Sequence, residues 1–299
     1  MSAAYARRMP ARGRRHPAPV ELLPLVLAGA TVLAQITYPL LDGRALTLVT
    51  IATVLLFCTA SLVHATVTAG PRTALLVLLV AGGSGLVAEA VGTATGFPFG
   101  PYEYSGTLGW EVLQVPVVIP LAWTMMAWPM LLLGRRLSAA LLTRAGTAGR
   151  GPSGRGGARA ALTALTGGLG LAAWDLYLDP QMTEAGHWVF AQPEPGLPGV
   201  PGIPLTNYAG WALVAVLMVS LLDAVVPERE VDERVPALLL AWTWLGSGLA
   251  NLAFFGRPEV AAYGLVGMGL FVGPYLLLHR ARQRERAAAA RRTRSASTA

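Results

Sequence analysis

The sequence predicts an all-α membrane protein, a polytopic bundle of about eight transmembrane helices with both termini in the cytoplasm. The chain has 299 residues, of which 54% are hydrophobic and only 13% are charged, about half the charged share of a soluble domain. Long apolar runs recur along it, and about 20 apolar residues suffice to cross a bilayer. Every basic residue is an arginine, and the arginines flank these runs. This placement fits membrane topology and anionic lipid headgroups better than nucleic-acid binding.

Eight runs are long enough to span, and the first is too long for a cleaved signal peptide although it follows an arginine-rich start. The expected spans are Val20–Leu41, Leu46–Ala69, Thr73–Gly92, Val112–Gly134, Arg159–Asp179, Tyr208–Val226, Val235–Phe255 and Val260–His279. They divide the chain into a basic cytoplasmic N-terminus (1–19), one transmembrane domain (20–279) and a basic cytoplasmic tail (280–299). We expect the glycine-rich segment 135–158 to be a flexible cytoplasmic loop and the tail to be disordered at its end.

The arginines also predict the orientation. Of the 23 basic residues, 21 fall in the two terminal segments and in alternate loops, and only Arg44 and Arg257 fall on the other side. Because cytoplasmic loops carry the excess of arginine, this split indicates a multi-pass protein of the cell membrane with both ends inside. The 97–111 loop and the 179–207 segment then lie on the outer side.

Three carboxyl groups gather near the outer ends of the spans: Glu89, Asp175 and Asp179. An ionisable group inside a membrane costs about 2.5–3.5 kcal/mol at a helix centre and commonly marks a functional site. Asp175 and Asp179 are one helical turn apart and share a face. We expect Asp175 or Glu89 to donate a proton while the other holds water. Asp179 precedes Pro180, so we expect it at a helix end, positioning water or simply interfacial.

Aromatic residues accompany these acids more densely than an interfacial belt requires, above all in the stretch FPFGPYEYSGTLG. Its prolines predict a stiff, turned backbone that could re-enter the membrane. The candidate substrate-binding set comprises Phe97, Phe99, Tyr102, Glu103 and Tyr104 from this stretch, Trp174 from the later WDLYLDP stretch, and Trp188, Asn207 and Trp211 beyond it.

An aromatic pocket with carboxyl groups suits an uncharged lipophile. A buried carboxyl can stay protonated and transfer its proton to an alkene, and aromatic faces stabilise the resulting carbocation. A second carboxylate could then orient water or remove a proton. The four histidines have no metal-ligand spacing, so we expect no metal site. The outer side has too few arginines to hold a diphosphate.

The motifs FPFGPYEYSGTLGWEVLQVPVVIPLAW, WDLYLDPQM, HWVF and GIPLTNYAGW resemble the carotenoid-biosynthesis integral membrane family. The similarity is strongest from Glu89 to Trp211 and includes the hydratases of that family, which act on acyclic carotenoid end groups. The resemblance implies a cofactor-independent hydro-lyase that adds water across a terminal double bond. Its partners would be the lipophilic carotenoid, membrane lipid and other enzymes of the pathway, with no nucleic acid.

Other functions remain open from the residues alone. An acid-catalysed carotenoid cyclase or isomerase would use the same groups. A proton-coupled carrier could use Glu89, Asp175 and Asp179 as a relay, and a carotenoid-binding scaffold would need no chemistry. The confinement of the polar residues to the outer layer argues against a carrier, which needs a path to both sides.

Overall fold

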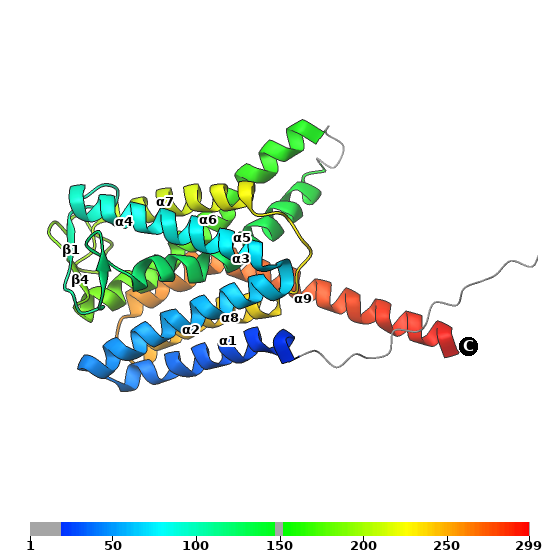
Figure 1. Ribbon diagram of the computed structural model, residues 1–299, viewed down its shortest axis with the longest axis horizontal. Coiled ribbons are helices and arrows are strands. Elements are labelled where there is room, and N and C mark those ends of the chain that lie inside the picture. Colours follow the sequence, from blue (N-terminus) through cyan, green and yellow to red (C-terminus); the bar gives the residue numbers. More distant parts are fainter. Residues whose placement is uncertain (1–18, 147–151, 299) are drawn as a thin grey trace, which may run out of the picture.

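The computed structural model describes residues 19–146 and 152–298 and shows one helical bundle (Figure 1). Within those residues, eight helical segments are long and apolar enough to cross a membrane. The predicted all-α, multi-pass membrane architecture is therefore confirmed. Residues 1–18 of the expected basic N-terminus and residues 147–151 of the expected loop lie outside the described residues.

The bundle is built from long helices joined mostly by short connections. The segment from α3 to α4 forms a single span because η2, a π-helical turn, continues the helix between them. The helices are α1 (Pro19–Thr37), η1 (Tyr38–Leu40), α2 (Gly43–Ala69), α3 (Pro71–Val77), η2 (Leu78–Gly82), α4 (Gly83–Thr95), α5 (Val118–Arg144), α6 (Pro152–Glu184), α7 (Leu205–Val225), α8 (Arg234–Ala253) and α9 (Pro258–Thr298).

Helix α5 forms the centre of the bundle. The most apolar part of its span is 83% buried, against 22–56% for the other spans. It packs on α2 and α6, while α6 also packs on α7 and α9. Glycines allow the closest of these approaches: a Cβ added at Gly134 would lie 2.6 Å from the carbonyl oxygen of Thr163 on α6. Small residues at such crossings are the usual way for membrane helices to pack tightly.

Two short strand pairs, which the sequence analysis did not anticipate, lie at the end of the bundle opposite the C-terminus (Figure 1). Strand β1 (Tyr102–Tyr104) pairs antiparallel with β4 (Trp188–Phe190), with Tyr102 opposite Phe190 and Tyr104 opposite Trp188. Side chains alternate along a strand, so these four aromatic residues face the bundle while Glu103 is exposed. The pairing joins the two loops that carry most of the candidate aromatic residues.

Several expected span boundaries differ from the structure, and the start of the fourth span is one of them. The span expected from Val112 starts only at Val118, because β2 (Glu111–Val112) and β3 (Val115–Pro116) form a hairpin there. Leu113 and Gln114 make its turn with positive φ values of 55° and 63°. Proline disfavours helical geometry in the residue before it, so Pro116 favours the extended backbone that Val115 adopts in β3.

Helix α6 does not end at Asp179 as expected but continues for another turn to Glu184, with Pro180 inside it. A proline in a helix removes one backbone hydrogen bond, yet membrane helices tolerate this where neighbouring groups compensate. Asp179 is consequently part of a continuous helix and is only 2% exposed. It is not an interfacial residue at a helix end.

Helices also occupy segments that the sequence analysis treated as loop and tail. Helix α5 runs to Arg144 and α6 begins at Pro152, so helix covers much of the 135–158 segment. Helix α9 continues to Thr298, and Figure 1 shows it projecting from the bundle; the sequence analysis expected disorder at the end of this tail. Its alanine- and arginine-rich sequence has high helix propensity.

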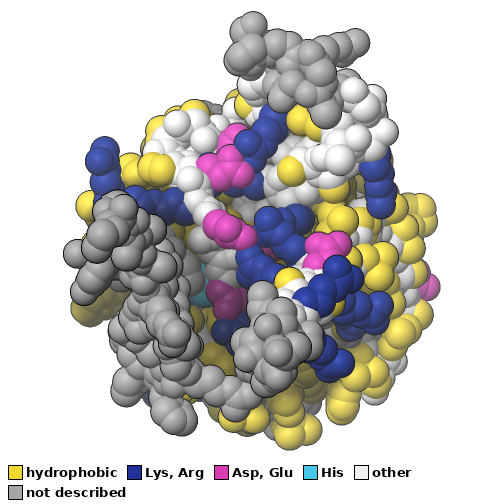
Figure 2. All heavy atoms as spheres, turned by 90° about the vertical axis from the view of Figure 1, so that its right-hand side faces the viewer, with side chains coloured by type: hydrophobic (Ala, Val, Ile, Leu, Met, Phe, Trp, Pro, Cys, Tyr) yellow, Lys and Arg dark blue, Asp and Glu magenta, His cyan; other side chains and the backbone are white. Residues whose placement is uncertain are grey.

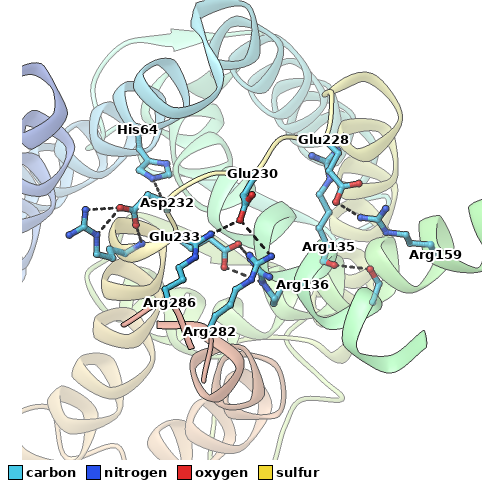
Figure 3. A network of polar contacts seen from close by, with 12 residues as sticks. His64, Arg135, Arg136, Arg159, Glu228, Glu230, Asp232, Glu233, Arg282 and Arg286 are labelled. Atoms are coloured by element: carbon cyan, nitrogen blue, oxygen red, sulfur yellow. Dashed lines mark hydrogen bonds and ion pairs between the residues drawn. The ribbon is translucent and has the colours of Figure 1, made fainter. Parts of the chain in front are cut away.

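The arginine-rich end of the bundle is closed by ion pairs to the connection between α7 and α8. Figure 2 shows arginines and acids intermixed on this face, and Figure 3 shows the network from close by. The sequence analysis assigned these arginines to topology and lipid contact and did not identify their acidic partners. The pairs are Arg135–Asp223, Arg136–Glu233, Arg159–Glu228, Arg234–Asp232, and Arg282 and Arg286 with Glu230.

A buried histidine, His64 on α2, links the connection between α7 and α8 to α5. The indole N–H of Trp128 on α5 donates to Nδ1 of His64 on α2 at 2.9 Å. Since Nδ1 accepts, Nε2 carries the proton and donates to the carbonyl oxygen of Asp232 at 2.7 Å. His64 is therefore fully used as a structural link at this end, away from the candidate acids.

Candidate active site

A cavity lies towards the end of the bundle that carries β1 and β4. It offers about 150 Å³ to the centres of water-sized molecules, which is room for several waters or for the end of an apolar molecule. Residues from α1, α2, α4, α5, α6, α7 and α8 and from both strands of the β1–β4 pair line it. Two of the three predicted acids, Glu89 and Asp179, belong to its wall.

Glu89 on α4 is held by three donors. Its Oε2 accepts hydrogen bonds from the hydroxyl groups of Tyr102 at 2.5 Å and Tyr104 at 2.8 Å. Its Oε1 accepts one from the indole N–H of Trp123 on α5 at 2.9 Å. The side chain is 5% exposed. Both oxygens act as acceptors, which is the arrangement that suits a carboxylate.

The two tyrosines stay in their neutral, hydrogen-donating form. Burial and the neighbouring Glu89 carboxyl raise the pKa of Tyr102 and of Tyr104 above the ordinary value for a phenol. A hydroxyl that keeps its proton can go on donating to Glu89. The β1–β4 pairing therefore matters for the chemistry of the site as well as for its structure, because it holds two hydrogen-bond donors, Tyr102 and Tyr104, against the carboxyl group of Glu89.

Asp175 and Asp179 on α6 converge on one amide. Nδ2 of Asn207 on α7 donates to Oδ2 of Asp175 at 2.8 Å and also to Oδ2 of Asp179. Oδ1 of Asp179 accepts a further bond from the indole N–H of Trp188 at 3.1 Å. Oδ1 of Asp175 is buried without a hydrogen-bond partner. Two carboxyl groups this close do not both ionise readily and can share a proton.

The two aspartates differ in what they face. Asp179 belongs to the cavity wall, whereas Asp175 is fully buried behind it. The sequence analysis placed Asp175 as the donor or water-holding acid and Asp179 at the margin. In the structure, Asp179 is the one of the pair placed to touch a bound molecule.

Three tryptophans from different helices form an aromatic corner of the cavity. The rings of Trp123 and Trp211 stack with centroids 3.9 Å apart, and Trp174 meets Trp211 edge-on at 5.9 Å. Trp188, expected as a binding residue, is 7% exposed and lines the cavity. An aromatic face that is open to the cavity can stabilise a positive charge that forms against it.

Two glycines allow the loop that precedes β1 to pack closely against α4 and α7. A Cβ at Gly92 on α4 would lie 2.9 Å from both the Phe99 ring and the Tyr102 hydroxyl oxygen, and one at Gly210 on α7 would lie 2.7 Å from the carbonyl oxygen of Pro98. Neither position leaves space for a larger residue. Phe99 is consequently 2% exposed and forms part of the cavity wall.

Most of the predicted site residues come together. The cavity wall contains Glu89, Phe99, Tyr102, Tyr104, Trp174, Asp179, Trp188, Asn207 and Trp211. Phe97 and Glu103 do not contribute: Phe97 is 63% exposed, and Glu103 lies on the outward face of β1. Trp110, just after the same loop stretch, is 90% exposed and does not line the cavity.

The sequence analysis missed Trp123 and a polar part of the wall. Trp123 lies inside an apolar run, and the only signal in the sequence was that a buried tryptophan needs an acceptor for its indole N–H. Hydroxyl residues on α2 and α8 also line the cavity: Thr50, Thr53, Thr243 and Ser247. Among the described residues that form the wall, none is Arg, Lys or His, so the site suits a ligand without anionic groups.

Comparison with known proteins identifies the family of the chain. Searches of curated proteins and of solved structures gave no match. A family model described as carotenoid biosynthesis protein matches residues 46–274, which include both aspartates, Glu89 and the aromatic loops. The chain is thus a multi-pass membrane protein that belongs to the carotenoid biosynthesis protein family.

Proposed function

We propose that this protein is a cofactor-independent hydratase that adds water across a terminal double bond of a linear carotenoid. Family membership supports a carotenoid substrate. The observation that carries the proposal is the pairing of Asp179 and Glu89 in one aromatic wall with no basic side chain. An acid and a separately held carboxylate are the two groups that an acid-catalysed hydration requires.

The first step is protonation of the alkene. The proton shared between Asp175 and Asp179 passes from Asp179 to one alkene carbon, and the π electrons of the double bond form the new C–H bond. The other carbon becomes a tertiary cation. Trp123, Trp174 and Trp211 line the same cavity as Asp179, and aromatic rings and a nearby carboxylate both lower the energy of such a charge.

The second step is capture by water. A lone pair of the water oxygen forms the C–O bond, and the proton that water loses goes to Glu89. This assigns Asp179 as the proton donor, Glu89 as the base and Asp175 as a positioning residue that acts through Asn207 and Asp179. Return of one proton from Glu89 to the aspartate pair restores the starting state.

The proposal is tested by Asp179→Asn in a host that makes linear carotenoids. This change keeps the size of the side chain but removes the transferable proton, so the unhydrated precursor should accumulate. General acid catalysis typically contributes about 10²–10⁴-fold, and the loss of product should be of that order. Glu103→Gln is the matched control, since it removes an acid on the outward face of β1 and should leave the product unchanged.

Three results would contradict the proposal. A variant Asp179→Asn that is as active as the native chain would remove the donor from the mechanism. A cyclised or isomerised product without a new hydroxyl group would show that the cation loses a proton instead of gaining water. An unaltered carotenoid in every host, with the native chain correctly inserted, would favour a carrier or a binding protein.

A further inference from the structure

The cavity has a second, polar part that the proposed acid chemistry does not use. It is formed by faces of α2 and α8. We call its hydroxyl residues, Thr50, Thr53, Thr243 and Ser247, the hydroxyl arm. On each helix the lining positions follow a single face: 50, 53, 54 and 57 on α2, and 242, 243, 246, 247 and 250 on α8.

The hydroxyl groups of the arm can still form further hydrogen bonds. Thr50 and Thr243 each donate to a carbonyl oxygen one turn earlier in their own helix, both at 2.9 Å. Their hydroxyl oxygens can still accept from a ligand. Thr53 is 8% exposed, and its hydroxyl oxygen is buried without any hydrogen-bond partner. A buried hydroxyl without a partner carries a desolvation penalty that a bound polar molecule would relieve.

A ligand of the arm must be polar, small and uncharged. The wall there has no charged side chain among the described residues, so an ion has no counter-charge. An apolar polyene would leave the Thr53 hydroxyl unpartnered. A water molecule can accept from Thr53 and donate to Thr50 or Thr243, which gives it the two or more partners that buried water requires.

We infer that the hydroxyl arm holds the water that captures the carbocation, with Thr53 as a positioning residue that orients it. The inference rests on the proposed hydration. The arm and the Asp179–Glu89 wall are parts of one cavity, so water held there reaches the cation without crossing protein. When water fails to arrive, the cation loses a proton from a neighbouring carbon, and Glu89 takes that proton to leave an alkene.

This competition gives a measurable ratio. Purified protein is supplied with a linear carotenoid in D₂O, where the transferable position of Asp179 carries deuterium. Captured cations appear as tertiary alcohol, and uncaptured cations appear as alkene that carries deuterium or a shifted double bond. The native chain should yield mainly alcohol.

The variant Thr53→Val keeps the side-chain shape and removes the hydroxyl. We expect the ratio of alcohol to deuterated or isomerised alkene to fall about fivefold, the factor that one ordinary hydrogen bond represents. Thr53→Ser restores a hydroxyl and should restore the ratio. Thr59→Val is the matched control, because Thr59 lies on the exposed face of the same helix. Ser247→Ala tests the α8 side of the arm and should lower the ratio in the same direction.

The possible outcomes distinguish a failure of the hydroxyl arm from a failure of the proposed hydration. An unchanged ratio in both Thr53→Val and Ser247→Ala, with native alcohol formation intact, would overturn the role of the arm while leaving hydration standing. A raised KM for the carotenoid with an unchanged ratio would show that the arm binds the polyene instead. If the native chain forms neither alcohol nor deuterated alkene, the proposed hydration fails and this inference fails with it.

Discussion

Replacing Glu89 by glutamine separates a catalytic carboxylate from a merely structural one. Three donors point at Glu89, from Tyr102, Tyr104 and Trp123. Truncation to alanine would leave all three unsatisfied, at roughly 1–3 kcal/mol each, and could unfold the protein. Glutamine avoids this, since its carbonyl oxygen can accept from Trp123 while its amide donates to the tyrosine hydroxyls, which can also accept.

The expected effects on stability and on rate then diverge. Each charge-assisted bond that becomes neutral loses about 1 kcal/mol, but the protein no longer has to bury a carboxylate, and the two changes oppose each other. We therefore expect a small change in Tm. Turnover should fall by about 10²–10⁴-fold, because the amide can neither stabilise the cation nor take a proton from water. That factor corresponds to roughly 3–5 kcal/mol in the barrier.

The assay uses purified native and Glu89→Gln protein in detergent with a linear carotenoid. Product is quantified by chromatography, and thermal unfolding is followed on the same samples. A variant that turns over at the native rate, with or without a change in Tm, would refute a catalytic role for Glu89. In that case the Tyr102–Glu89–Tyr104 contacts would serve only to anchor the β1–β4 pair.

Further predictions concern the loop, the membrane orientation and metals. Gly92→Ala should lower turnover, because the added methyl would lie 2.9 Å from the Tyr102 hydroxyl oxygen and displace it from Glu89; native activity in a folded Gly92→Ala variant would contradict this. Reporter fusions should read cytoplasmic after Arg144 and external at Tyr104, given the excess of arginine at one end of the bundle; an external signal after Arg144 would reverse the proposed orientation. Activity should survive treatment with EDTA, and a loss that magnesium restores would require a metal-dependent mechanism.

The spans and the acids could be predicted from the sequence because both depend on strong local signals. About 20 apolar residues must be helical to cross a bilayer, and a carboxyl group among them is conspicuous. The boundaries were less predictable. The hairpin at 111–116 and the continuation of α6 past Pro180 both depend on tertiary contacts that periodicity does not report.

The sequence could not predict which of the site residues face the cavity, for a similar reason. Asp175 and Asp179 lie one turn apart, so the sequence places them on one face and cannot say which of them reaches the cavity. The three-residue alternation of Tyr102, Glu103 and Tyr104 was readable as a strand that turns Glu103 away. Its partner, β4, lies more than 80 residues later, and no local pattern links the two.

The α9 extension shows how a polar composition can mislead. Residues after Arg280 have no apolar face, which favoured disorder, yet they continue an existing helix and so need no new nucleus. Pairing of Arg282 and Arg286 with Glu230 fixes the start of the extension against the α7–α8 connection. The acidic partners were visible in the sequence, but their approach to α9 follows only from the fold.

Isotope labelling tests the central claim most directly. The native protein, incubated with a linear carotenoid in water enriched in ¹⁸O, should give a tertiary alcohol whose mass carries one heavy oxygen for each new hydroxyl group. The Asp179→Asn protein, inserted and folded as the native chain, should give no such product. An unlabelled hydroxyl group, or a carotenoid whose mass never changes, would contradict hydration at this site.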